Sequence, residues 1–207
     1  MIIIAVLITL CTGYLIGSVS FAVIFSRAFA GKDVRALGSG SAGTTNVFRS
    51  FGPVPAVLTA AGDFGKGVLS AFLGIVICRA LGQGGLPGAY IAGFGAVVGH
   101  MAPVFFGFKG GKSVMTTAGI ILMTDPLCLL ILFALFALVF LCGKIVSLSS
   151  ISVAFAYFII TLILRRLFWP ETCFAIVSGG LVIFLHRANI GRLLRGEEAK
   201  ITNKRRL

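Results

Sequence analysis

The chain has 207 residues, of which 58% are apolar and only 12% are charged, and its mean hydropathy is +1.07. Soluble domains contain roughly 45–50% apolar and about 25% charged residues, so one small water-soluble core cannot hold this excess. The net charge is +12, from 18 basic and 6 acidic side chains. These numbers argue against a soluble enzyme, a disordered chain or a disulfide scaffold, and they predict an integral membrane protein.

Segments long enough to cross a bilayer, which takes about 20 apolar residues, follow one another along the chain. The stretch 113–143 exceeds one crossing, and Asp125-Pro126 interrupts it, because an acid is costly within a bilayer and Pro breaks a helix. Division at this pair gives the seven expected spans 2–26, 53–81, 88–106, 113–124, 126–143, 150–164 and 172–187. A re-entrant or tilted segment is the alternative for the short half 113–124. The sequence therefore predicts an all-α integral membrane protein with about seven transmembrane helices, in one polytopic domain over 1–207.

The basic side chains give this arrangement an orientation. With the N-terminus outside, 15 of the 18 basic residues fall on one side, and only Arg79, Arg165 and Arg166 fall on the other. Lys and Arg accumulate in cytoplasmic loops, so the richer side is expected to be cytoplasmic, together with the C-terminus and a basic tail over 187–207. The surplus thus orients the chain and suits anionic substrates or lipid headgroups, and it does not indicate a nucleic-acid partner. The cysteines include no C-x-x-C pair, so neither a metal site nor another cofactor is expected.

The loop from Gly38 to Arg49 is dense in glycines and hydrogen-bond donors. Its polar side chains are Ser39, Ser41, Thr44, Thr45, Asn46 and Arg49. Glycine lets the backbone approach a ligand closely, and the planar guanidinium donates two parallel hydrogen bonds to a phosphate. The G-x-G-x-x-G spacing within the loop does not indicate a dinucleotide site, because a membrane span and not a strand precedes it. The pattern favours a phosphate-binding loop over a solvated turn.

A second loop places Lys109 and Lys112 on either side of Gly110-Gly111. A compact ammonium at a helix end suits a dianion, so this loop is also a candidate phosphate site. His100 lies on the preceding span, where a structural role between helices and a catalytic role are both open. In the N-terminal turn of 53–81, Asp63 and Lys66 are one helical turn apart and are expected to pair near the headgroups.

The third polar region follows the last span. It begins at His186 and Asn189 and continues as a basic amphipathic stretch, expected as a continuation of the helix along the membrane surface. A tail that only anchors the helix explains its arginines, but it does not explain a histidine and an amide at the membrane exit. Ser147, near Lys144, belongs to a weaker polar patch for which helix capping is the simplest explanation.

Three sets of residues, in order and with matching spacing over residues 10–200, resemble the bacterial acyl-phosphate:glycerol-3-phosphate acyltransferase family. They are Gly38-Ser39-Gly40, Gly43, Thr45-Asn46 and Arg49, then Gly99-His100, Pro103-Val104 and Phe108-Lys109-Gly110-Gly111-Lys112, then His186-Arg187, Asn189-Ile190 and Arg192-Leu193-Leu194. The chain departs from the family pattern at Ser41, where Asn is common, and at Ser113, where Gly is usual. Both departures keep a small residue.

The resemblance implies an integral enzyme of the bacterial plasma membrane with its active site on the cytoplasmic face. Members of the family transfer an acyl group from acyl-phosphate to the sn-1 hydroxyl of glycerol 3-phosphate, which gives lysophosphatidic acid and phosphate in the first step of phospholipid synthesis. The expected partners are these two substrates and membrane lipid. Catalytic roles are implied for Ser39, Lys112, His186 and Asn189. Substrate contacts are implied for Gly43, Thr45, Asn46, Arg49, Lys109, Gly110, Gly111 and Ser147.

Acyl-phosphate is already activated, so such an enzyme mainly has to orient its reactants and stabilise an oxyanion. Two groups are candidates for the base, His186 and the donor phosphate, whose second pKa is about 6, and we favour the phosphate. An anion channel or transporter is the alternative from another class. It predicts charges deep within spans, whereas Asp125 and the Asp63–Lys66 turn are expected near span ends. Which loop holds which phosphate stays open, and a monomer suffices for this chemistry.

Overall fold

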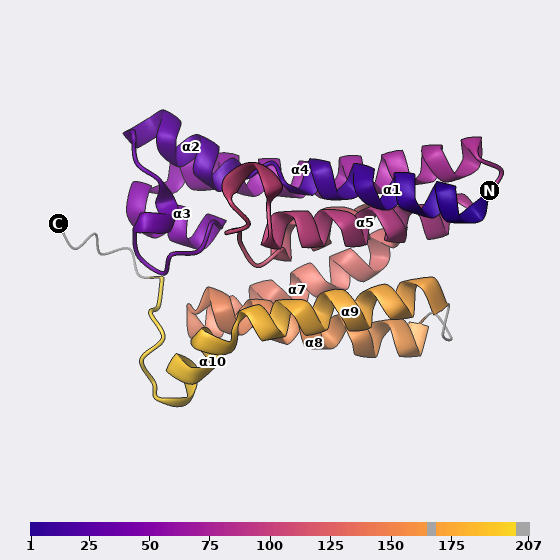
Figure 1. Ribbon diagram of the computed structural model, residues 1–207. Coiled ribbons are helices and arrows are strands. Elements are labelled where there is room, and N and C mark those ends of the chain that lie inside the picture. Colours follow the sequence, from indigo (N-terminus) through magenta and orange to yellow (C-terminus); the bar gives the residue numbers. More distant parts are fainter. Residues whose placement is uncertain (165–168, 202–207) are drawn as a thin grey trace. The chain divides into compact units, whose positions relative to one another are not determined.

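The computed structural model describes residues 1–164 and 169–201, and every regular element in those residues is a helix (Figure 1). The predicted all-α membrane fold is confirmed. Five of the basic residues that set the predicted charge asymmetry, Arg165, Arg166, Lys204, Arg205 and Arg206, lie outside the described residues. The chain divides into two compact units, Met1–Pro126 and Leu127–Leu207, and each is described by itself.

The first unit is built around three long helices that pack against one another, α1, α4 and α5, with the shorter α6 against α4 and α5 (Figure 1). Its elements are α1 (Ile2–Gly17), α2 (Phe21–Ala30), η1 (Val34–Ala36), α3 (Thr44–Phe51), α4 (Pro53–Ala80), α5 (Gly85–Met101), η2 (Val104–Phe106) and α6 (Val114–Thr124). Short elements α2, α3 and η1 surround a small apolar cluster that includes Val23, Val34 and Val47. This cluster supports the loop from Gly38 to Arg49, because Val34 precedes that loop and Val47 lies within it.

The second unit contains α7 (Pro126–Gly143), α8 (Val146–Leu164), α9 (Trp169–Leu185) and α10 (Arg187–Leu194). Helices α8 and α9 pack together, and the rings of Tyr157 and Phe174 meet edge to face with centroids 6.4 Å apart. The chain bends by 58° between α9 and α10, at His186. The basic tail therefore does not continue the last span as one helix, as the sequence had suggested, but turns away from it at this histidine.

Each of the seven predicted apolar segments contains a helix, although several boundaries differ, and the break at Asp125-Pro126 is confirmed, with α6 ending at Thr124 and α7 beginning at Pro126. Within residues 1–164 and 169–201, five helical stretches are long and apolar enough to cross a membrane, with Ile2–Ala30 (α1 and α2) counted as one, or six if the bent pair α9–α10 counts as one span. The 11 residues of α6 extend about 16 Å, roughly half of a bilayer core. The seven-span count and the orientation of the termini remain predictions.

Two polar features lie elsewhere than the sequence suggested. Because α4 begins at Pro53, Asp63 and Lys66 lie about three turns inside the helix and not in its first turn. The predicted span 2–26 is also interrupted, since α1 ends at Gly17 and α2 begins at Phe21. Both deviations place polar groups within the apolar part of the first unit, where each needs a partner.

Candidate active site

Asn46 organises the glycine-rich loop through its amide group. Its Nδ2 donates to the carbonyl oxygens of Val34, Leu37 and Ser41 at 3.0, 3.0 and 3.1 Å, and its Oδ1 accepts from the Ser39 backbone N–H at 3.1 Å. The residue is only 3% exposed. A buried amide bonded to four backbone groups fixes the path of the loop, so the geometry gives Asn46 a structural part in addition to the substrate contact predicted for it.

The other predicted residues of this loop lie at its surface or at the start of α3. Gly43 is the N-cap of α3, Thr45 is half-buried in its first turn, and Ser39 and Arg49 are exposed. The start of a helix presents backbone N–H groups that favour an anion. The loop therefore brings a hydroxyl, a guanidinium and a helix start to one exposed edge of the first unit.

The second predicted loop contacts the first through its backbone. The N–H of Ala42 donates to the carbonyl of Gly110 at 3.2 Å, while the N–H groups of Gly110 and Gly111 donate to Met101 and His100 carbonyls at 3.1 and 3.0 Å. A Cβ at Gly110 would lie 1.9 Å from the His100 oxygen, and one at Gly111 would lie 2.5 Å from the Ala42 oxygen. Only glycine permits this approach, so both residues are required for the two loops to meet.

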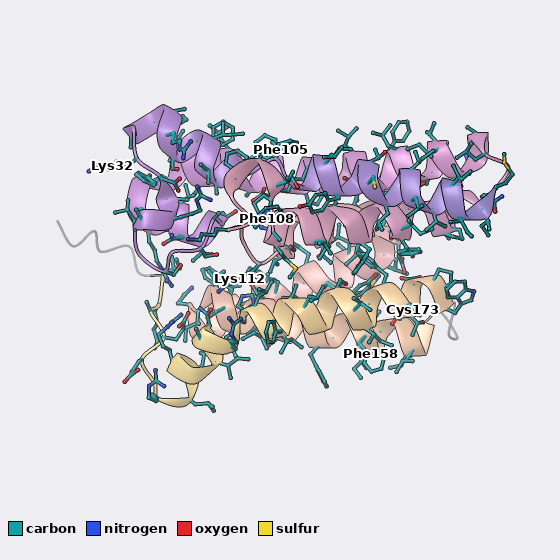
Figure 2. All side chains as sticks on the ribbon, viewed as in Figure 1. Lys32, Phe105, Phe108, Lys112, Phe158 and Cys173 are labelled. Atoms are coloured by element: carbon teal, nitrogen blue, oxygen red, sulfur yellow. The ribbon has the colours of Figure 1, made fainter. Side chains whose placement is uncertain are left out.

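Lys109 and Lys112 flank these glycines, the first exposed and the second half-buried, and Phe105 and Phe108 are exposed on the turn before them (Figure 2). At Ser113, where the family pattern has Gly, the backbone has φ +60°, in the left-handed region that favours glycine. Its hydroxyl donates to the Val97 carbonyl at 3.0 Å. Serine thus adopts here a backbone conformation that glycine adopts more easily, and its side chain makes a buried hydrogen bond that glycine could not make.

Arg35 connects the two loops, a role that its charge alone does not indicate in the sequence. Its Nη1 donates to the carbonyls of Phe106 and Lys109, the latter at 3.2 Å. Its Nε and Nη2 donate to the two oxygens of Asp33 at 3.0 and 2.8 Å. The guanidinium therefore holds the lysine-bearing loop against the segment that leads into Gly38.

Asp33 is the anchor of this arrangement. Its Oδ1 also accepts from the Arg35 backbone N–H at 2.9 Å, and its Oδ2 pairs with Arg27 at 2.9 Å. The hydrogen bonds from Arg35 hold the pKa of the Asp33 carboxyl well below its usual value, and Asp33 in turn raises the pKa of Arg35. Both groups thus stay charged across the physiological range, and the connection between the loops persists with them.

The second unit brings together two of its predicted residues around a carboxylate. Ser147 Oγ and Asn189 Nδ2 both donate to Glu198 Oε1, at 2.8 and 2.7 Å, and Arg192 Nε donates to Glu198 Oε2 at 2.6 Å. The Glu198 side chain is 2% exposed. Burial alone would raise the pKa of Glu198, but the hydrogen bonds from Asn189, Ser147 and Arg192 outweigh it and lower the pKa. These donors are therefore occupied by a carboxylate of the chain itself.

His186, the third predicted residue of this unit, occupies the bend between α9 and α10 and is 3% exposed. Its Nδ1 lies 2.7 Å from the Val182 carbonyl oxygen. Because a carbonyl can only accept, the neutral ring carries its proton on Nδ1, and Nε2 holds the lone pair. That tautomer is able to accept a proton. Among the described residues, no group of three or more His, Cys, Asp or Glu side chains is placed to hold a metal ion.

Comparison with known proteins identifies the family. A family model described as glycerol-3-phosphate acyltransferase matches residues 7–196. The chain belongs to the glycerol-3-phosphate acyltransferase family. It is 41% identical over 208 residues to the glycerol-3-phosphate acyltransferase of Syntrophomonas wolfei subsp. wolfei, covering 97% of this chain and 98% of that protein. It is 43% identical over 194 residues to a Neisseria meningitidis serogroup C enzyme of the same name, covering 93% and 95%.

Two solved structures of PlsY, an integral membrane glycerol 3-phosphate acyltransferase, resemble the fold closely. The glycerol 3-phosphate form has a TM-score of 0.86 and 35% identity over 95% of this chain and 96% of that one. The lysophosphatidic acid form has a TM-score of 0.82 and 34% identity over 95% of both chains. The family that the three motifs predicted is confirmed, and this glycerol-3-phosphate acyltransferase is an integral membrane protein.

Replacing Asp33 by Asn removes the charge that holds Arg35. Because the folded-state pKa of Asp33 lies below its unfolded value of about 3.9, the stability from this pair is present above that pH and is lost as the pH falls below it. We expect the wild type to unfold at a higher temperature than Asp33→Asn, with a constant difference from about pH 8 to pH 5 that shrinks toward pH 3. Thermal unfolding in detergent measures this. A difference that disappears already between pH 8 and pH 6 would contradict the assignment.

Glu198→Ala leaves the buried donors of Ser147 and Asn189 without their acceptor, so we expect a loss of about 1–3 kcal/mol in the free energy of unfolding. Glu197→Ala is the matched control, because Glu197 is 56% exposed and pairs with Arg195 at the surface. Its effect should stay within about 0.5 kcal/mol. Denaturant titration of the two variants measures both values, and equal losses would rule out the proposed clustering around Glu198.

Proposed function

We propose that this acyltransferase moves the acyl group of acyl-phosphate to the sn-1 hydroxyl of glycerol 3-phosphate and releases inorganic phosphate. The observation that carries this proposal is the hydrogen bond from Ala42 to Gly110, which joins two glycine-rich, cation-bearing loops in one unit. A reaction between two phosphate-bearing substrates needs two such anion sites close together. The PlsY structures, with glycerol 3-phosphate and lysophosphatidic acid forms, agree with this substrate and product.

The first loop is proposed to hold the headgroup of acyl-phosphate. Ser39, Thr45 and Arg49 would donate hydrogen bonds to the phosphate and polarise the acyl carbonyl, and Gly43 would let the start of α3 approach it. Asn46 supports this arrangement by fixing the loop through its four backbone bonds. Ser39 and Arg49 are exposed, which is consistent with side chains that a ligand at the membrane surface can reach.

Glycerol 3-phosphate is proposed to bind at the second loop. Lys109 and Lys112 would meet its phosphate, with Gly110 and Gly111 keeping the backbone close to it. In the second unit, considered by itself, His186, Asn189 and Ser147 are proposed as substrate-contacting residues. The observed clustering of Ser147 and Asn189 around a carboxylate supports an anion-binding capacity in these donors.

In the proposed reaction the sn-1 oxygen attacks the acyl carbonyl carbon, and the carbon–oxygen bond to phosphate breaks. The hydroxyl proton passes either to the departing phosphate or to His186. The phosphate of the donor has a second pKa of about 6, and it is bonded through oxygen to the carbon that reacts. We therefore favour it as the base. His186, protonated on Nδ1, has the tautomer required of the alternative base.

The proposed location is the cytoplasmic face of the bacterial plasma membrane. Fifteen of the 18 basic residues fall on that side in a seven-span arrangement with the N-terminus outside, and an apolar acyl chain can then lie between helices in the bilayer. We propose that one chain, as a single polytopic domain, carries both substrate sites and needs no partner subunit or cofactor.

A channel or transporter is less well supported than an enzyme, although one observation bears on it. Asp63 and Lys66 lie deep within α4, where transport pathways often place charged groups. Their side chains pair with each other at 2.9 Å and are each 3% exposed. A closed, neutralised pair does not line an anion pathway, and the family assignment is that of an acyltransferase.

The donor is tested with purified protein in liposomes. We expect glycerol 3-phosphate and palmitoyl-phosphate to give 1-acyl lysophosphatidic acid and inorganic phosphate in equal amounts, measured by mass spectrometry and phosphate release. Palmitoyl-CoA and palmitoyl-acyl carrier protein should give no product in parallel reactions. Product from either thioester but none from palmitoyl-phosphate would overturn the proposed donor, and a 2-acyl product would overturn the sn-1 assignment.

The base is tested separately with His186→Gln and His186→Ala. If the donor phosphate accepts the proton, the Gln variant should keep kcat within about tenfold of the wild type, because a lost general base costs about 100- to 10,000-fold. Its pH–rate profile should also keep the acidic limb of the wild type. A Gln variant that folds but loses the activity and that limb would make His186 the base.

A further inference from the structure

Three ionisable side chains meet inside the first unit, away from the exposed edge that carries the substrate loops. Lys66 Nζ lies 2.9 Å from Asp63 Oδ1, and His100 Nδ1 lies 3.5 Å from the same oxygen. The side chains of Asp63, Lys66 and His100 are 3%, 3% and 7% exposed. We call these three residues the buried ionic cluster. No step of the proposed reaction uses it.

One end of the cluster reaches the interruption between α1 and α2. Lys66 Nζ donates to the Val19 carbonyl oxygen at 2.8 Å, at a residue that belongs to neither helix. Beside it, Ser18 Oγ donates to the Tyr14 carbonyl at 2.8 Å and accepts from the Val104 N–H at 3.4 Å. The ammonium thus satisfies a carbonyl that has no helical partner and ties the break to α4.

The other end lies directly beneath the lysine loop, residues 109–112. The carbonyl of His100 accepts the Gly111 N–H at 3.0 Å, and a Cβ on Gly111 would lie 2.3 Å from His100 Nε2. The imidazole therefore fills the space beside Gly111. It lies between Asp63 and Gly111, so it can support the loop through the backbone of Gly111.

A buried ion pair contributes little to the net free energy of unfolding. Removing two charges from water costs about as much as their attraction returns, and apolar residues of similar volume often stabilise a protein as well or better. The ion pair also has a direction, because one oxygen, Asp63 Oδ1, lies 2.9 Å from Lys66 Nζ and 3.5 Å from His100 Nδ1, which relates the position of the His100 ring to that of the pair. The ring in turn restricts where the Gly111 backbone can lie, and so it restricts the positions of Lys109 and Lys112.

We propose that the buried ionic cluster positions the lysine loop and so sets the affinity for glycerol 3-phosphate, with His100 as a positioning residue. This inference rests on the proposed binding of glycerol 3-phosphate by Lys109 and Lys112. It assigns to three intramembrane residues a role in substrate affinity that reaches the ligand only through the backbone of Gly111.

The test is equilibrium binding of radiolabelled glycerol 3-phosphate to the full-length protein in nanodiscs, without any acyl donor. In Asp63→Leu/Lys66→Met the pair is replaced by apolar side chains of similar volume. We expect the fold to be retained with a lower unfolding temperature, because the Val19 carbonyl loses its donor, while Kd rises about 2- to 30-fold, the range for residues that act on a site without touching its ligand. Under turnover, KM for glycerol 3-phosphate should rise and kcat should change little.

Two further variants keep the test decisive if the double variant does not fold. His100→Leu fills the ring volume without a donor for Asp63, and His100→Asn retains an N–H near the Nδ1 position, so Leu should weaken binding more than Asn. Thr59→Val is the control, because Thr59 is fully buried on the same helix and its hydroxyl donates to the Pro55 carbonyl of that helix, 2.7 Å away. It should bind like the wild type.

Lys112→Gln supplies the reference for direct loss of a loop contact and should weaken binding of glycerol 3-phosphate. Folded cluster variants that bind glycerol 3-phosphate as tightly as the wild type would overturn the inference. A loss of kcat and thermal stability with unchanged Kd would also overturn it, since that pattern is merely structural. A wrong acyl donor would leave these binding results unchanged, so the failure of the proposed donor and the failure of this inference are distinguishable.

Discussion

The backbone approach at Gly110-Gly111 is the contact on which the site of the first unit depends. There the chain passes so close to Ala42 and to His100 that no side chain fits on either glycine. The hydrogen bond from Ala42 to Gly110 makes two separate loops into one surface, and Arg35 joins the same loops from outside through carbonyls of Phe106 and Lys109. The cationic side chains that we propose as phosphate ligands, among them Lys109 and Lys112, are carried by these joined loops.

The helices beneath these loops contain buried polar groups, and polar groups inside a membrane need partners within the protein. The break between α1 and α2 exposes the Val19 carbonyl, and Lys66 supplies its donor. The ammonium in turn needs an anion, which Asp63 provides, and the shared oxygen of Asp63 reaches His100. A requirement of the bilayer thus generates a chain of polar contacts that ends next to the lysine loop, where we propose that glycerol 3-phosphate binds.

Much of the fold was predictable because hydropathy and Pro positions report directly on bilayer crossing, as the boundary at Asp125-Pro126 confirms. The two loops were recognisable because phosphate binding requires glycine and donors close together in sequence. Arg35 was missed because its partners lie about 70 residues away, and its charge alone was explained by membrane orientation. Glu198 was missed for a similar reason, since a carboxylate in a basic tail gives no sign that Ser147 will fold against it.

The distribution of the acids explains why so basic a chain can hold a defined site. Of the 6 acidic residues, Asp33, Asp63, Glu197 and Glu198 each pair with a basic side chain within six positions along the chain. These short-range pairs neutralise Arg35, Lys66 and Arg192, the cations that shape loops and helix ends. An acid beside Lys109 would instead compete with phosphate for the same ammonium. Structural cations are thus balanced by carboxylates, and the remaining positive charge, a surplus of +12, suits the proposed reaction, in which both substrates are anions.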